Sequence, residues 1–255
     1  MRVRFIVALC SVCALFGQTP NFTGVWKANI EKSQFNGPAP TEYLAIFDQQ
    51  GSKLTEQTGT FGAHGEQRAS FTYNTDGKPS MNSLHGMPMR TQASWSGGVL
   101  MIEAKVAGHP ASITEKYALS SDGNTLTITS TMTAEGKTTE RTMVLEKQPD
   151  SAGEALRKPE ATASARFKNV QILKDLPASQ FIDAMRSFSM SLGVDCDYCH
   201  VQNDRASDDK PAKNMARKML IMTHSINDST FGGKMEVRCY TCHRGQAEPQ
   251  SRPAF

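Results

Sequence analysis

Short runs of alternating hydrophobic and polar residues extend from residue 22 to about residue 147, for example at 42–47 and 125–129. Turn dipeptides interrupt these runs at Asp76-Gly77, Gly97-Gly98, Asp122-Gly123 and Glu135-Gly136. A period of two residues broken by such turns predicts antiparallel hairpins. Because closing a sheet hides its unpaired edges, we expect a small antiparallel β-barrel or curled sandwich.

The pattern changes after residue 147. Residues 148–167 are rich in proline, alanine, serine and charged side chains, and they contain few large apolar residues. Such a composition does not offset the entropy lost on ordering, so we expect a linker. This places a β-rich domain at residues 18–147, a linker at 148–167 and a second domain at 168–255.

The second domain shows the periodicity of helices, which makes the expected fold class α+β with two domains. Residues 178–191 predict a helix with Pro177 in its first turn and Gly193 as its stop. One face of this helix carries Phe181, Met185 and Phe188.

A second helix is predicted from Pro211 to about Ile226. Its spacing places Met215, Met219 and Met222 on one face. Methionines on an apolar face usually serve as flexible core filler, and they also suit the cover of a large flat apolar cofactor.

The pentapeptide Cys-x-x-Cys-His occurs twice in the last quarter of the chain. Two cysteines three positions apart lie on one side of a helical turn, where both sulfurs reach the vinyl groups of one porphyrin. The histidine that follows is then an axial ligand of the iron. We therefore expect two covalently bound c-type haems, with attachment at Cys196, Cys199, Cys239 and Cys242 and ligation by His200 and His243.

The start of the chain is typical of a secretory signal peptide. Arg2 and Arg4 precede an apolar run at residues 5–16 that is too short to span a bilayer. We expect residues 1–17 to be removed, with a retained membrane anchor as the alternative. The predicted location is the periplasm or the cell exterior, with membrane association as a variant of it.

Removal of the signal peptide would take away Cys10 and Cys13 and leave only the four motif cysteines. Thioether bonds to haem would use all four, so no disulfide is expected in spite of an oxidising compartment. A structural zinc site built from the two Cys-x-x-Cys pairs is a less favoured alternative. The balance of 28 basic against 25 acidic residues gives no sign of nucleic-acid binding.

Residues 168–249 resemble the cytochrome c subunit of photosynthetic reaction centres. In that family each unit is a helix that carries an axial methionine, a turn and a Cys-x-x-Cys-His helix. The similarity includes the helix between the two motifs as well as the motifs themselves. It is carried by residues 168–173, 185–200, 216–223, 226–227 and 239–245.

The resemblance implies a sixth ligand for each iron. Met185 would bind the first haem opposite His200, and Met219 would bind the second opposite His243. Met222 and His224 compete with Met219 for the second position.

The chain also departs from that family. Its photosynthetic members carry four haems in two pairs, whereas this chain has one pair and a β domain in place of the other. A histidine that serves the other pair in those members has no counterpart between Asp228 and Arg238. A respiratory or other redox chain is therefore at least as consistent with the sequence as photosynthesis.

Histidine and methionine on each iron leave no open position for oxygen or peroxide. We therefore expect an electron-transfer protein rather than an enzyme, with a redox protein or a membrane electron-transfer complex as donor and acceptor. A dihaem enzyme of the peroxidase type is the alternative if a methionine fails to bind. Candidate cations for pairing with haem propionates are Lys213, Arg217, Lys218 and Arg244, each of which is otherwise an ordinary solvated charge.

The β domain has no evident chemical site in its sequence. The tripeptide Gly24-Val25-Trp26 looks like the Gly-x-Trp of lipocalin-type barrels, although a core tryptophan that plugs one end of a barrel is the better explanation. We expect this domain to bind a small ligand or to dock a partner.

Overall fold

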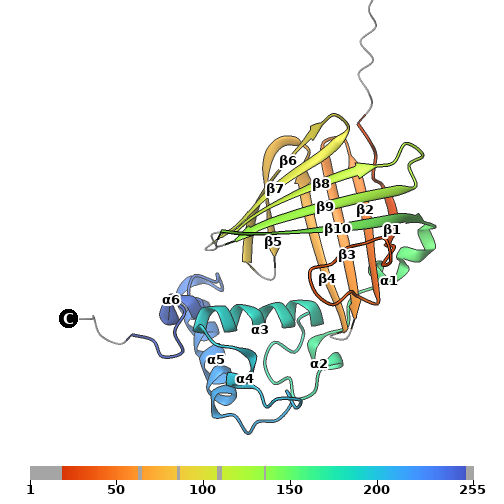
Figure 1. The fold of residues 1–255 in the computed structure, drawn as a ribbon. Helices are drawn as coiled ribbons and strands as arrows, with labels where there is room; N and C mark the ends of the chain where they lie inside the picture. The colour runs from red at the N-terminus through yellow and green to blue at the C-terminus, as the bar shows by residue number, and fades with distance from the viewer. Residues whose placement is uncertain (1–18, 63–64, 85–86, 108–110, 135, 251–255) are drawn as a thin grey trace, which may run out of the picture.

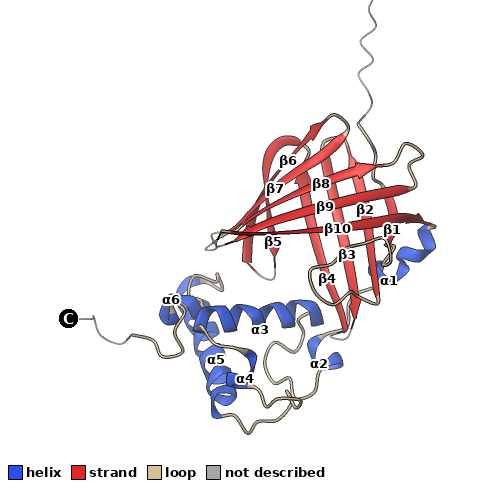
Figure 2. Ribbon diagram, viewed as in Figure 1, coloured by secondary structure: helices blue, strands red, loops and turns tan. Residues whose placement is uncertain are grey.

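The computed structural model describes residues 19–62, 65–84, 87–107, 111–134 and 136–250. It contains a curled antiparallel sheet followed by a group of helices, so the expected α+β fold class is confirmed (Figures 1 and 2). The predicted signal peptide and Glu135, in one of the predicted turns, lie outside the described residues.

The sheet has ten strands in the order β4-β3-β2-β1-β10-β9-β8-β7-β6-β5, and every pair is antiparallel. Strand β1 pairs with both β2 and β10, so the first and the last strand of the β domain are neighbours in the sheet. The strands are β1 (Gly24–Ala28), β2 (Glu42–Gln50), β3 (Lys53–Gly62), β4 (Gly65–Asn74), β5 (Asp76–Leu84), β6 (Met87–Ser96), β7 (Val99–Val106), β8 (Ser112–Leu119), β9 (Thr125–Ala134) and β10 (Lys137–Gln148).

Alternating side chains of these strands meet inside the curled sheet. Trp26 is completely buried there, and its Nε1 donates to the carbonyl oxygen of Phe22 at 2.8 Å. The rings of Phe22, Phe47 and Tyr117 pack together with centroids about 6 Å apart. Trp26 is thus a core residue, and aromatic side chains fill this region of the barrel.

The sheet curls until its two edge strands, β4 and β5, lie side by side, but no backbone ladder joins them. The side-chain amide of Asn82 bridges the gap instead, accepting from the Thr72 N–H at 2.7 Å and donating to the Thr72 carbonyl at 3.0 Å. The prediction of a paired hairpin at Asp76-Gly77 was therefore wrong. Pro79, which has no N–H, stands beside an irregularity in the first residues of β5, as expected for an edge strand.

Residues 148–167 are more ordered than their composition predicts. They form a 3₁₀ turn (Asp150–Gly153) and two short helices, α1 (Glu154–Arg157) and α2 (Ala163–Arg166). The guanidinium of Arg68 on β4 donates to the carbonyl oxygens of Ala155, Leu156 and Lys158. Polar contacts to the barrel therefore replace the apolar contacts that this segment lacks.

The remaining helices are α3 (Ala178–Leu192), α4 (Cys196–Cys199), α5 (Pro211–Phe231) and α6 (Cys239–His243). Helix α3 ends at Gly193 as predicted, although Pro177 is its N-cap rather than a residue of its first turn. Helix α5 begins at Pro211 as predicted but continues five residues beyond Ile226. Among the described residues, no helix combines the length and apolar character needed to cross a membrane.

A carboxyl group is buried inside the barrel. Glu56 is only 3% exposed, and its Oε2 accepts hydrogen bonds from the hydroxyls of Tyr117 at 3.1 Å and Tyr73 at 3.4 Å. Burial and, to a smaller extent, the charge of Glu115 raise the pKa of Glu56 to about 8, although the hydrogen bonds from Tyr117 and Tyr73 oppose this shift. The folded protein therefore keeps this carboxyl protonated at neutral pH.

We predict that the stability of the barrel falls as the pH rises from about 4.5 to about 8. In that window the unfolded chain has released the proton of Glu56, whereas the folded protein still holds it. The slope contributed by this one group is at most ~1.4 kcal/mol per pH unit. Urea denaturation followed by the fluorescence of Trp26 and Trp95, which both lie in the barrel, measures it.

The variant Glu56→Gln should lose most of this slope, and Glu103→Gln, at an exposed position of β7, should keep it. An unchanged slope in Glu56→Gln would show that other groups cause the pH dependence.

Candidate functional site

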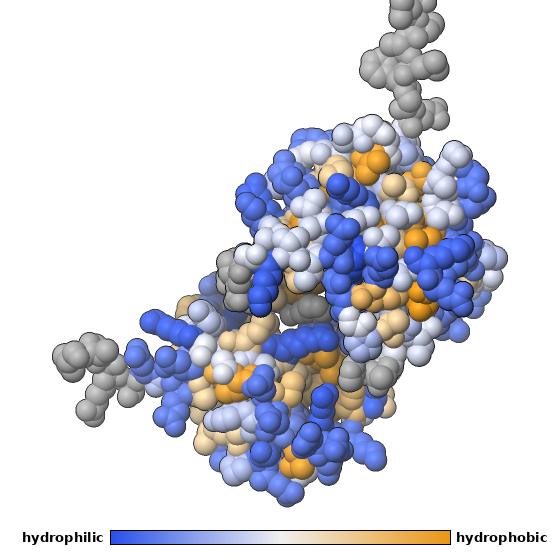
Figure 3. All heavy atoms as spheres, viewed as in Figure 1, coloured by the Kyte–Doolittle hydropathy of each residue, from blue (hydrophilic) through white to orange (hydrophobic). Residues whose placement is uncertain are grey.

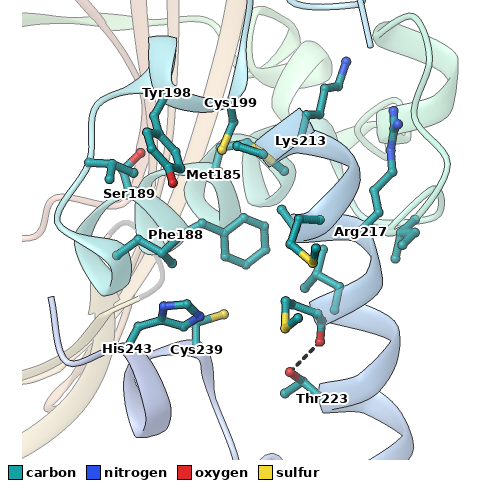
Figure 4. A pocket seen from close by; sticks show the side chains of 18 of the residues that line it. Met185, Phe188, Ser189, Tyr198, Cys199, Lys213, Arg217, Thr223, Cys239 and His243 are labelled. Carbon is teal, nitrogen blue, oxygen red and sulfur yellow. Dashed lines mark hydrogen bonds between the residues drawn. The ribbon is translucent and has the colours of Figure 1, made fainter. Parts of the chain in front are cut away.

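The helical part holds a cavity of about 600 Å³ bounded by α3, α4, α5 and α6. In Figure 4, Cys199 and Met185 lie near one end of this pocket, and His243 and Cys239 lie toward the other. Among the described residues, the four motif cysteines form no disulfide bond with one another. All eight residues that the sequence assigns to haem attachment or iron ligation line this one cavity: Cys196, Cys199, Cys239, Cys242, His200, His243, Met185 and Met219.

Apolar side chains of α3 and α5 form two facing walls. Phe188 points from α3 into the space between the two helices (Figure 4), and Phe181 and Leu220 also line the cavity. On α5, Met215, Met219 and Met222 are 50%, 37% and 47% exposed, although all three line the cavity. Such an uncovered apolar wall fits a large flat cofactor better than it fits solvent. Apolar side chains also show on the outer surface of the helical part (Figure 3).

Each motif histidine is oriented by a backbone carbonyl. The Nδ1 of His200 lies 2.9 Å from the carbonyl oxygen of Arg205, and the Nδ1 of His243 lies 3.0 Å from that of Gln246. A carbonyl oxygen only accepts, so each Nδ1 carries the proton and donates it. In the neutral imidazole this leaves the lone pair on Nε2, which is the atom that then binds iron. The residues present therefore fit c-type haem.

The electrostatic surroundings of His200 also favour the neutral imidazole. Burial lowers its pKa, and the charges of Lys213, Arg205 and Arg217 lower it further, while the bond to the Arg205 carbonyl acts in the opposite direction. Burial raises the pKa of the Cys199 thiol as well.

A polar network holds the loop that follows the first motif. Asp208 forms ion pairs with Lys213 at 3.2 Å and with Arg217 at 2.9 Å, both from the first two turns of α5. Asn169 donates to the Asp208 carboxylate at 2.9 Å and to the carbonyl of Ala206 at 2.6 Å. These bonds lower the pKa of Asp208 to about 2, with the bond from Asn169 as the largest cause. Lys213 and Arg217 are thus engaged in the protein itself, which weakens their assignment to haem propionates.

Asn227 plays the corresponding role near the second motif. It is 1% exposed, and its Oδ1 accepts from the backbone N–H groups of Glu236 at 3.1 Å and Val237 at 2.9 Å. Its Nδ2 donates to the carbonyl oxygen of Val237 at 2.8 Å. One side chain of α5 therefore fixes the loop that leads into α6.

The end of α3 and the residues after α6 approach each other closely. The backbone N–H of Gly245 donates to the carbonyl oxygen of Ser191 at 2.9 Å. Gly193 caps α3 with φ of 65°, and a Cβ atom at this position would overlap the carbonyl group of Gly245. This contact places α6 beside the C-terminal end of α3.

The structure also bears on the other candidate iron ligands, on the remaining candidate partners of haem propionates and on the zinc alternative. Met222 lines the cavity together with Met219, whereas its other competitor His224 does not. Lys218 is exposed on α5 and does not line the cavity, so the structure does not support its assignment to a haem propionate, and Arg244 follows His243 with φ of 50°. The described residues contain no group of three or more His, Cys, Asp or Glu arranged to hold a metal ion, so the two Cys-x-x-Cys pairs do not converge as tetrahedral zinc requires.

A profile of the family described as photosynthetic reaction centre cytochrome C subunit matches residues 118–252. The chain belongs to this cytochrome family. Membership implies covalently bound c-type haem, and it confirms the resemblance inferred from residues 168–249. The match to the family begins earlier than that resemblance, within β8.

The cytochrome is similar to the photosynthetic reaction center cytochrome c subunit of Thermochromatium tepidum, at 38% identity over 34% of this chain and 23% of the relative. It is also similar to the corresponding subunit of Roseobacter denitrificans, at 34% identity over 35% of this chain and 27% of the relative. Cytochrome c-554 of Chloroflexus aurantiacus is 38% identical over 29% of this chain and 20% of the relative. The chain thus spans about a quarter of the length of the curated relatives that it matches.

Two solved structures are similar to the β domain. One is a secretory abundant heat soluble protein of Ramazzottius varieornatus, with a TM-score of 0.40 and 11% identity over 49% of this chain and 94% of that one. The other is zebrafish ileal bile acid-binding protein in complex with cholic acid, with a TM-score of 0.38 and 19% identity. The similarity covers 50% of this chain and 98% of that one.

We predict that Gly193→Ala destabilises the helical part more than Gly232→Ala. Both glycines cap a helix in the left-handed region, with φ of 65° and 60°. Alanine at either position costs about 1–2 kcal/mol for that conformation. Only at Gly193 does the new methyl group also meet the backbone of Gly245, whereas Gly232 has nothing within 4 Å of a Cβ atom.

Chemical denaturation followed by helical circular dichroism compares the two variants. The overlap should add ~1–3 kcal/mol for Gly193→Ala. If the two variants are destabilised equally, the end of α3 and Gly245 lie farther apart in solution than in this structure.

Proposed function

We propose that this protein is an exported c-type cytochrome that binds two haems in one cavity and transfers electrons by outer-sphere exchange, without catalytic turnover. The observation that carries the proposal is the convergence of both Cys-x-x-Cys-His motifs and four methionines on a single cavity of about 600 Å³. The family to which the chain belongs, and its similarity to cytochrome c-554, support electron transfer as the activity.

Haem in this cavity would supply one-electron chemistry at iron. The side chains of the protein attach it and set its environment. Two cysteines of each motif form the thioether bonds, and the carbonyl bonds at Nδ1 hold the imidazoles of His200 and His243 so that each Nε2 can ligate. Phe181, Phe188 and Leu220 line the cavity and would shield a bound haem from water, which would lower the local dielectric constant and favour the reduced state.

We propose Met185 and Met219 as the sixth ligands of the first and second haem. A thioether ligand favours ferrous iron and leaves no position open for oxygen or peroxide. The position of Met185 on α3 and of Met219 on α5, both on the cavity wall, supports this assignment. Met222 occupies the same wall of α5 and remains an alternative for the second haem, whereas His224 does not line the cavity.

Export follows in this proposal from the signal peptide expected at residues 1–17, with domains at 18–147 and 168–255 joined by residues 148–167. The donor and acceptor are redox proteins or a membrane electron-transfer complex, in a photosynthetic or a respiratory chain. The helical domain carries twelve Lys or Arg against ten Asp or Glu in residues 168–255, so shape rather than charge would guide docking.

For the β domain we propose a docking role. Its interior around Trp26 is filled by aromatic side chains, which favours docking over the binding of a small ligand in that region. Strand β4 also contacts α3 directly, with the guanidinium of Arg186 3.4 Å from the side-chain oxygen of Gln67.

The first test is the intact mass and visible spectrum of the full chain expressed with a cytochrome c maturation system. We expect a mass increase of two haems and low-spin spectra in both oxidation states, because each iron has two strong axial ligands. Two haems with a high-spin component would favour a peroxidase-like enzyme. Absence of covalent haem would refute the proposal.

We further predict that Met185→Ala and Met219→Ala each remove about half of the weak charge-transfer band that marks methionine bound to ferric iron. Met190→Ala is the matched control, because Met190 lies on α3 but does not line the cavity. If Met219→Ala leaves the band unchanged and Met222→Ala halves it, the second ligand is Met222.

A further inference from the structure

Lys213 is a cation enclosed by a loop rather than a solvated charge. Its side chain is only 11% exposed, in the first turn of α5. The ammonium donates to the carbonyl oxygens of Arg205 at 2.9 Å, Ala206 at 3.0 Å and Ser207 at 2.7 Å, and it pairs with Asp208 at 3.2 Å. This loop connects the first haem motif to α5.

The carbonyl oxygen of Arg205 has a second donor. It is the same atom that accepts the hydrogen bond from Nδ1 of His200 at 2.9 Å. The ammonium and the imidazole are therefore joined through one oxygen. For the second motif the corresponding acceptor is the carbonyl of Gln246, to which no Lys or Arg side chain among the described residues donates. The two histidines thus differ in that only the carbonyl that accepts from His200 also accepts from a lysine ammonium.

The positive charge of this cluster is only partly neutralised. Asp208 pairs with Arg217 at 2.9 Å as well as with Lys213, so one carboxylate faces two cations. Arg217 is 13% exposed, which limits screening by water of the charge that remains.

Two physical effects of Lys213 act in the same direction. A carbonyl oxygen that is already polarised by an ammonium accepts less strongly from Nδ1–H, which makes His200 a less electron-rich ligand. A poorly screened positive charge close to that histidine also opposes the extra positive charge of oxidised iron. Both effects favour the reduced state of the haem that His200 ligates.

We propose that Lys213 is a positioning residue that raises the reduction potential of the first haem through the Arg205 carbonyl and leaves that of the second haem unchanged. It thereby biases a transferred electron toward the haem of the first motif. This inference rests on the proposed function, since it requires both haems to be bound.

The test is a potentiometric titration of the full-length protein with both haems attached, followed in the visible spectrum and fitted with two one-electron components. The variant Lys213→Met removes the charge and the donors, whereas Lys213→Gln removes the charge and keeps an N–H donor for the carbonyls. Lys218→Met removes an exposed charge from the same helix as a control. Intact mass confirms that each variant carries two haems.

We expect the equilibrium constant for reduction of one component to fall roughly tenfold in both Lys213 variants, which is ~59 mV for a one-electron couple. The other component and the Lys218→Met protein should match the wild type. If Lys213→Met loses haem, the reduction potentials of Lys213→Gln and the wild-type protein are compared instead, and their difference tests the inference.

Three results would overturn the inference: a wild-type potential in Lys213→Gln, which would mean that Lys213 only anchors the loop; equal shifts of both components; or the same shift in Lys218→Met. Absence of haem from the wild-type protein would instead refute the proposed function.

Discussion

The geometry of the cavity depends on hydrogen bonds that helix α5 makes to the loops beside it. The loop after the first motif and the loop before the second lie outside the sheet, and turn bonds within them satisfy only part of their backbone groups, so side chains bind others. Lys213 does this near the start of α5, and Asn227 does it near the end. Because both motifs are held to the same rigid helix, the positions of the two histidines are set relative to each other.

The barrel extends this rigidity to the rest of the chain. Arg68 on β4 binds three carbonyl groups of the connecting segment, and Glu160 in that segment accepts from both the backbone N–H and the hydroxyl of Ser179 in the first turn of α3. A chain of polar contacts therefore runs from the sheet to the helix that forms one wall of the cavity. The contact of β4 with α3 also covers part of the outer surface of that helix.

Local sequence signals predicted what depends on local geometry. Helix α3 ends at Gly193 and α5 begins at Pro211 because these residues act within one turn of the chain. The motif spacing likewise singled out the cysteines and histidines, and the structure brings them to one cavity. The ordered structure of residues 148–167 was not predictable from composition. It depends on Arg68, which is 90 residues from its partner Lys158 in the sequence. The roles of Lys213 and Asn227 were hidden for the same reason, since their partners are backbone groups that carry no sequence signal.

The seam between β4 and β5 gives the barrel an uneven resistance to opening. Every other pair of neighbouring strands is joined by a backbone ladder, whereas this pair is held by side chains such as Asn82. Separating the two edges breaks few hydrogen bonds and unpairs no ladder, so the lowest-energy local unfolding of the sheet begins there. The strand on one side of the seam is also the strand that contacts α3, so the most easily opened line of the β domain adjoins the helical part.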